Sequence, residues 1–569
     1  MLEASQFNDT IGILCENEEE EISSAPSTKK GRETILSYLR MIFRPRAKKV
    51  GRSSDSENSD SYVHGLGFNW KSLKKLILCI GPGAILSHGY TDPGNIQSDM
   101  QTGTVVGYQL LWVLLFSTAI GVLLQCLAVR LTVVTGRHLS QICYEEYGKL
   151  TRILLWLVVE ISVIASDIQS VIGTAMAIYL LSNGRIPLWG GVIITCIDAF
   201  IVLFLELFGL RVLEGVFGLM LGVMTKSFGY EYVKSKPDQA DVFKGIFAPM
   251  CKGCNDYQWM MAVATIGAVL MPYNIYLHSG LISKKTIKRE TKGHLDEAKI
   301  LYCVEAGIAL LMAFIINLFV VCIFASGLYG KTYEEFYSIC ENSNNSRYHN
   351  ISNGDLNGNQ TITKTNFVEG GVYLACQYGD ATMYIWAISI FIAGQSSTMS
   401  KMFASQFVLE GFFDLKWKRW QTALFSRTFA IIPCIGVAFA VSDTTCPNIL
   451  NDNMKLFSTF NDSLNYTMAL MLPSALIPLL TFTCDKRIMG EYVNSTRLSI
   501  CLFISVTCLG IGYSMHICYL FSSKFNSRSA VIVVVGIGYG MFHIYLTILM
   551  VVRWYKTCET RDDTVTLSD

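Results

Sequence analysis

Charged residues are scarce in this sequence. Asp, Glu, Lys and Arg make up 16% of its 569 residues, whereas 51% of the residues are hydrophobic. Soluble domains contain about 25% charged residues, so the composition excludes an ordinary soluble multidomain protein. The formal net charge is only +1, so nothing in the composition suggests a nucleic-acid partner.

The N-terminal region lacks the basic and apolar stretches of a cleavable signal peptide and instead has an acidic run over residues 16–21. Residues 1–70 are polar and cannot bury a core, so we expect a disordered cytoplasmic tail that ends in the basic run 44–49. There are 18 cysteines, but most fall in apolar segments, which is typical of small buried residues rather than of a disulfide scaffold.

Long apolar segments dominate the rest of the chain. A membrane-spanning helix needs roughly 20 apolar residues. The sequence predicts an all-α, multi-pass membrane transporter domain over residues 71–552, followed by a cytoplasmic tail over 553–569. About twelve segments are long enough: 74–99, 105–129, 153–181, 187–207, 212–229, 260–282, 300–328, 381–399, 423–441, 463–482, 498–522 and 530–552.

The loops between the segments indicate an orientation, because basic residues accumulate in cytoplasmic loops. The loop at about 329–367 carries N-x-[ST] glycosylation sequons, which suits the outer side. With twelve segments, both termini are then cytoplasmic. The three sequons are at Asn344, Asn350 and Asn359. The basic cluster after the sixth segment consists of Lys284, Lys285, Lys288, Arg289 and Lys292. The basic cluster after the eighth segment consists of Lys401, Lys416, Lys418 and Arg419.

Two apolar segments are interrupted by helix-breaking residues. The first reads DPGN over residues 92–95 and the second reads MPYN over residues 271–274, so both show the spacing x-Pro-x-Asn. Proline lacks a backbone donor and glycine relaxes the backbone, so a helix opens at such a run. Open backbone at membrane depth is tolerated only where protein or a watery cavity covers it. Two such segments in corresponding halves of a chain indicate a transporter site built on an inverted repeat.

The residues at the two interruptions form a candidate metal site. Asp92 and Asn95 offer oxygen atoms, Met271 offers a thioether sulfur, and Ala268 offers a backbone carbonyl freed by the interruption. Hard oxygen ligands suit any divalent ion, whereas the softer sulfur favours transition metals over Ca²⁺ and Mg²⁺. We expect these four ligands to converge if the two interruptions face each other.

Ionisable residues inside the apolar segments are costly to bury and often functional. We expect Asp198, Glu206 and Glu305 to form structural ion pairs, because nothing in the sequence ties them to the interrupted segments. The others are Asp92, Asp99, Glu160, Asp167 and Arg427, with His88 and His278 beside the interruptions.

Longer motifs surround these residues over nearly the whole of 75–490. They include GPG and DPGN within 81–95, MPYNIYLHSG at 271–280 and GQSSTM within 394–412. The combination resembles the NRAMP family of proton-coupled divalent metal transporters. The resemblance implies a LeuT-like fold of two inverted five-helix repeats plus two additional C-terminal helices, with helices 1 and 6 discontinuous. It implies that Asp92, Asn95, Ala268 and Met271 are metal ligands, and that Asp92, Glu160, Asp167, His278 and Arg427 move protons.

The sequence departs from the usual family pattern near the site. Tyr273 stands where the family usually has His, and Ser170 where it usually has Glu. Met468 and Met471 replace the usual Gln and are candidates for additional metal ligands. His88, which is not usual in the family, is a candidate member of the proton pathway. The departures leave the four metal ligands intact but bear on proton coupling.

Together these features predict a carrier that moves Fe²⁺, Mn²⁺ and related ions into the cytoplasm, with protons, by alternating access. We expect a monomer in contact with lipid, without catalytic residues or a cofactor, in the plasma membrane or an endosomal or lysosomal membrane. One alternative is a Na⁺- or H⁺-coupled amino-acid carrier of the same fold, in which Asp92 would repel a substrate carboxylate and Met271 would have no use. Another is a metal-sensing receptor that binds without net flux.

Overall fold

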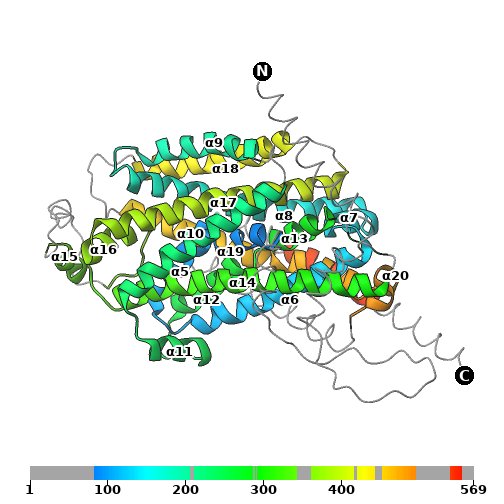
Figure 1. Ribbon diagram of the computed structural model, residues 1–569, viewed down its shortest axis with the longest axis horizontal. Coiled ribbons are helices and arrows are strands. Elements are labelled where there is room, and N and C mark those ends of the chain that lie inside the picture. Colours follow the sequence, from blue (N-terminus) through cyan, green and yellow to red (C-terminus); the bar gives the residue numbers. More distant parts are fainter. Residues whose placement is uncertain are drawn as a thin grey trace, which may run out of the picture. The chain divides into compact units, whose positions relative to one another are not determined.

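The computed structural model describes residues 82–205, 210–285, 287, 289, 291–341, 361–414, 419–442, 452–494 and 538–553. Within these ranges the regular elements are helices, apart from an isolated bridge between Thr332 and Thr361, so the predicted all-α class is confirmed there. The helices, most of them labelled in Figure 1, are α4 (Pro82–His88), α5 (Pro93–Val106), α6 (Leu111–Thr135), α7 (Leu139–Glu146), α8 (Lys149–Leu181), α9 (Leu188–Leu205), α10 (Leu210–Ser235), α11 (Gln239–Phe247), α12 (Asp256–Val269), α13 (Pro272–Ser283), α14 (Lys292–Leu328), α15 (Tyr333–Glu341), α16 (Phe367–Tyr378), α17 (Asp380–Phe413), α18 (Arg419–Ser442), α19 (Asp452–Thr483) and α20 (Lys486–Met489), with a further helix over Gly538–Arg553.

Six helical segments in the described ranges are long and apolar enough to cross a membrane. They are Leu111–Thr135, Lys149–Leu181, Val212–Ser235, Asp256–Ser283, Lys292–Leu328 and Ser458–Thr483. The predicted segment 498–522, the N-terminal tail, residues 554–569 of the C-terminal tail and the sequons at Asn344, Asn350 and Asn359 lie outside the described residues. Arg553, the first residue of the predicted C-terminal tail, instead ends the last described helix. The count of twelve segments therefore stays a prediction.

Both predicted interruptions break a helix. The first separates α4 from α5, and the second separates α12 from α13, with a proline at the first position of each following helix. An α-helical N–H donates to the carbonyl four residues earlier. Pro93 and Pro272 have no N–H, so they cannot donate to the carbonyls of Gly89 and Ala268. The same local chemistry thus frees one carbonyl at each break.

Two long helix pairs surround the breaks. α5 packs along α14, and α8 packs along α17. Gly103 of α5 lets the first pair approach closely, because a Cβ there would meet the backbone carbonyl of Val321. Glu305 of α14 accepts a hydrogen bond from the backbone N–H of Gly83 in α4, at 2.8 Å. The expectation that Glu305 has no tie to the interrupted segments is therefore wrong, since this carboxylate caps the first turn of α4.

The predicted end of the eighth apolar segment is also wrong. The segment was expected to end at 399, with Lys401 in a cytoplasmic loop, but α17 continues to Phe413 and leaves Lys401 only 1% exposed. Lys416 and Lys418, the next members of that basic cluster, lie outside the described residues.

Four cysteines outside the long apolar helices are paired. Cys340 of α15 and Cys376 of α16 form a disulfide, and so do Cys251 and Cys254, between α11 and α12. The first disulfide connects the two helices that flank the undescribed segment 342–360.

Candidate metal site

Asp92 is the N-cap of α5. Its Oδ1 accepts from the backbone N–H of Asn95 at 2.9 Å and from the Asn95 side-chain Nδ2 at 3.0 Å. A carboxylate at a helix N-terminus satisfies free N–H groups and complements the helix dipole. The local sequence therefore fixes both the position and the orientation of this carboxylate.

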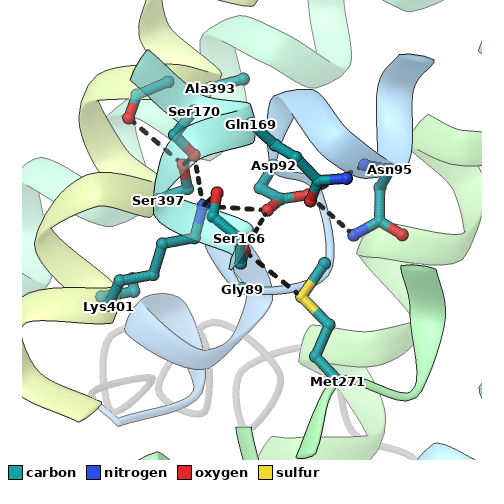
Figure 2. A network of polar contacts seen from close by, with 12 residues as sticks. Gly89, Asp92, Asn95, Ser166, Gln169, Ser170, Met271, Ala393, Ser397 and Lys401 are labelled. Atoms are coloured by element: carbon teal, nitrogen blue, oxygen red, sulfur yellow. Dashed lines mark hydrogen bonds and ion pairs between the residues drawn. The ribbon is translucent and has the colours of Figure 1, made fainter. Parts of the chain in front are cut away.

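The second carboxylate oxygen faces two other helices (Figure 2). Asp92 Oδ2 accepts from the Ser166 hydroxyl of α8 at 2.9 Å and lies 3.0 Å from the Lys401 ammonium of α17. Both charged side chains are buried, with exposed fractions of 0% for Asp92 and 1% for Lys401. Burial of two charges is tolerable only when each has a close partner, and here each charge neutralises the other.

Met271 lies beside the same hydroxyl. Its sulfur is 3.7 Å from the Ser166 hydroxyl and accepts from the Tyr273 hydroxyl at 2.9 Å. The hydroxyl oxygens of Ser166 and Tyr273 are 3.0 Å apart. Since Ser166 contacts both Asp92 and Met271, the predicted carboxylate and thioether ligands converge on one point between α5, α8 and α13 (Figure 2).

The other two predicted ligands, Asn95 and Ala268, each offer an oxygen acceptor. The Asn95 Oδ1 is buried and has no hydrogen-bond partner among the residues that the structure describes, which is unusual for a buried polar atom. The carbonyl of Gly89 accepts from Asn274 at 3.2 Å, whereas the equivalent carbonyl of Ala268 precedes Pro272 and has no backbone donor four residues on. The oxygen atoms of Asn95 and Ala268 are therefore acceptors that a cation can use.

This set of ligands differs from the common metal clusters of soluble proteins. Within the described ranges there is no group of three or more His, Cys, Asp or Glu side chains placed to hold a metal ion. The candidate site instead combines one carboxylate, one amide oxygen, one thioether and one carbonyl. Sulfur with a single anionic oxygen suits a transition metal better than Ca²⁺.

Comparison with known proteins assigns the chain to a family. Residues 83–517 match the family described as natural resistance-associated macrophage protein-like, or Nramp. The chain is 43% identical over 484 residues to Protein Malvolio of Drosophila melanogaster, covering 84% of this chain and 79% of that protein. It is 43% identical over 477 residues to natural resistance-associated macrophage protein 2 of Homo sapiens, covering 84% and 81%. The chain belongs to the Nramp family.

A solved structure shows the same fold. A variant of the Eremococcus coleocola manganese transporter superimposes with a TM-score of 0.71 at 23% identity, covering 86% of this chain and 97% of that chain. Family membership confirms the resemblance seen in the sequence. It also confirms the expectation of a metal-ion transporter in a membrane rather than an enzyme.

The predicted Nramp proton-pathway residues are spread over several helices. His278 donates from Nδ1 to Gln125 of α6 at 3.0 Å, and His88 from Nε2 to the Phe217 carbonyl of α10 at 2.9 Å. Glu160 accepts from Ser405 of α17 at 2.7 Å, and Asp167 is buried in α8 next to Ser166. Arg427 belongs to α18, but its side chain is not among the parts of the chain that the structure describes. These contacts bring neither histidine to Asp92.

The candidate additional ligands of α19 are placed less favourably. Met468 is fully buried and Met471 is partly exposed. The polar contacts from α19 to Gln169 of α8 are instead made by the Asn465 side chain, which accepts at 2.9 Å, and by the Asn461 carbonyl, which accepts at 3.3 Å. A metal-ligand role for the two methionines stays a prediction.

Sequence reasoning missed Ser166 and Lys401, the two side chains that join Asp92 from α8 and α17. The sequence did contain a signal that Lys401 lies within a helix rather than in a loop, because small and apolar residues continue on both sides of it, from Met399 to Phe403. Its partner, however, lies in a distant part of the sequence, so no local pattern reveals the pair.

Proposed function

We propose that this chain transports divalent transition-metal ions, Fe²⁺ and Mn²⁺ among them, with Asp92, Asn95, Met271 and the Ala268 carbonyl as ligands. The observation that carries the proposal is the convergence of the carboxylate and the thioether on Ser166 at two broken helices, beside the unpartnered Asn95 oxygen. Broken helices near the membrane midplane are where transporters of this type bind cations. The name of the Eremococcus coleocola manganese transporter agrees with this substrate class.

The deciding experiment is uptake of radioactive Mn²⁺ or Fe²⁺ by liposomes that contain the purified full chain. Saturable uptake above that of protein-free liposomes supports the proposal. Uptake of amino acids instead would favour the amino-acid carrier, and metal binding without accumulation would favour the receptor. The metal ion is cargo, and we propose no resident cofactor.

We further propose the complete architecture and orientation expected from the sequence. This is a twelve-helix, LeuT-like arrangement of two inverted five-helix repeats plus two C-terminal helices, with cytoplasmic termini and inward transport by a monomer. The two equivalent breaks support the inverted repeat. The Cys340–Cys376 disulfide supports an outer position for the loop 329–367, because disulfides persist outside the cytosol. The membrane is proposed to be the plasma membrane or an endosomal or lysosomal membrane.

Glycosylation tests this orientation. Removing the sequons at Asn344, Asn350 and Asn359 together is expected to eliminate most of the mass shift that glycosidase causes in the natural chain. Asn494→Gln serves as a matched control, because Asn494 also begins a sequon but is buried and bonded to Thr483. A glycan on Asn494 would contradict the proposed orientation.

Metal selectivity is expected to depend on the Met271 sulfur. In Met271→Ala the oxygen ligands from Asp92, Asn95 and Ala268 remain, so transport persists while discrimination against hard ions falls. Excess Ca²⁺ should then inhibit Mn²⁺ uptake several-fold more in the variant than in the natural chain. Loss of Mn²⁺ uptake without any competition by Ca²⁺ would show that the sulfur does not set selectivity.

We propose that protons accompany the metal only loosely. An imidazole can take up a proton near neutral pH, whereas the Tyr273 phenol stays neutral, and this phenol is engaged with Met271 and Ser166. Mn²⁺ uptake is therefore expected to depend little on an inward proton gradient, and Tyr273→His is expected to increase that dependence. Internal pH is recorded together with uptake, and strong acidification with the natural chain, lost in His88→Ala, would establish tight coupling through His88 instead.

A further inference from the structure

The Lys401 ammonium occupies a position where a cation is the expected cargo. It lies 3.0 Å from Asp92 Oδ2 and donates to the backbone carbonyl of Ser166 at 2.8 Å. It also donates to the Ser170 hydroxyl. The ammonium thus contacts the Asp92 carboxylate and neutral oxygens, much as a bound metal ion would (Figure 2).

The Asp92 carboxylate has no unused acceptor position. A carboxylate offers about four lone-pair sites on its two oxygens. Two donors from Asn95 engage Oδ1, while Ser166 and Lys401 engage Oδ2. A metal ion that binds Asp92 must therefore displace a donor, and the charged donor is the one that a divalent cation repels.

We infer that Lys401 is a tethered cation that takes the place of the metal at Asp92 in the empty carrier and withdraws when metal binds. The inference rests on the proposed function, since it concerns the same site. The Ser170 hydroxyl, which the ammonium already contacts and which lies 2.7 Å from the hydroxyl of Ser397, remains a partner for the ammonium when it leaves Asp92. Because this hydroxyl is neutral, it does not compete with the Asp92 carboxylate for the ammonium.

A tethered cation also affects the return of the empty carrier. An unpaired carboxylate at membrane depth is costly, so a carrier that has released its metal would reorient slowly with Asp92 exposed as a lone anion. Lys401 neutralises Asp92 in that state without any ion from solution. Net uptake, which requires the empty carrier to return, should depend on Lys401 more than metal exchange does.

The first measurement is Mn²⁺ affinity by calorimetry on the purified full chain. Lys401→Met, which removes the competing charge at similar size, should bind Mn²⁺ roughly tenfold more tightly or better, in the range of measured couplings between close charge pairs. Lys401→Arg keeps a cation and should bind like the natural chain. Lys285→Met is the matched control, because it also removes a lysine from an ion pair, 2.7 Å from Glu214, and should leave the affinity unchanged.

The second measurement separates competition from a general loss of structure. Liposomes with Lys401→Met should retain exchange of radioactive for unlabelled Mn²⁺ while net uptake slows, whereas a merely damaged protein would lose both. If Lys401→Met is not recovered as a monodisperse protein, Lys401→Gln replaces it. The quantity measured is then the rise in melting temperature that Mn²⁺ causes. A larger rise than in the natural chain supports the inference.

The outcomes distinguish this inference from the proposed function. Binding of Mn²⁺ by the natural chain with equal or weaker affinity in Lys401→Met overturns the tethered cation and leaves metal transport intact. Equal losses of exchange and net uptake in Lys401→Met likewise overturn it. A third outcome is that Lys401→Met binds Mn²⁺ tightly while the natural chain neither binds nor transports Mn²⁺. This outcome would support competition between Lys401 and the metal for Asp92 and would overturn the proposed function.

Discussion

Mn²⁺ uptake is expected to fall to the level of protein-free liposomes when Asp92 is replaced by Asn. The variant keeps the side-chain oxygen that caps α5, so the helix still begins at Pro93. It removes the one anionic ligand of the candidate site, and a divalent ion held at membrane depth by neutral ligands alone is strongly disfavoured. The loss is therefore electrostatic rather than a consequence of a misplaced helix.

The same substitution removes the carboxylate that lies 3.0 Å from the buried Lys401 ammonium. Removing one partner of a buried ion pair typically costs ~3–5 kcal/mol of stability, so Asp92→Asn should also melt at a lower temperature. Adding Lys401→Met to Asp92→Asn should recover much of the melting temperature but no uptake, which separates the role of Asp92 in folding from its role in binding. Uptake by the stable double variant would move the metal site away from Asp92.

The breaks in the two helices could be predicted because their cause is local. Proline at 93 and at 272 cannot donate a backbone hydrogen bond in any fold, and the structure breaks the helix at both positions. The same argument identified the Ala268 carbonyl, four residues before Pro272. The candidate ligands Asp92, Asn95 and Met271 were found because they stand beside these breaks in the sequence.

The partners of these ligands could not be predicted, because they come from distant helices. Lys401 was assigned to a cytoplasmic loop by the general rule that basic residues mark such loops. That rule uses only the local sequence, so it takes no account of a carboxylate from a distant part of the chain. The burial of Lys401 depends on the pairing of α8 with α17, which brings Ser166 and Ser170 to it. Glu305 was misjudged for the same reason, since its contact with Gly83 joins α14 to α4.

Ser170→Glu is expected to increase Mn²⁺ affinity roughly tenfold, which corresponds to ~1.4 kcal/mol. Ser170 already contacts the Lys401 ammonium, so a carboxylate at this position gives the ammonium a second anion and draws it away from Asp92.

The matched control is Ser170→Gln, which has nearly the same size and can accept from Lys401 but carries no charge. Calorimetry should show that Ser170→Glu binds Mn²⁺ more tightly than the natural chain and that Ser170→Gln binds it with nearly the same affinity as the natural chain. Combining Ser170→Glu with Lys401→Met should give no further gain over Lys401→Met alone, because the new carboxylate acts through the ammonium that the second substitution removes. Equal affinities for the Glu and Gln variants would show that Lys401 does not compete with the metal. A full additional gain in the double variant would instead show that the carboxylate at position 170 attracts the metal directly, without acting through Lys401.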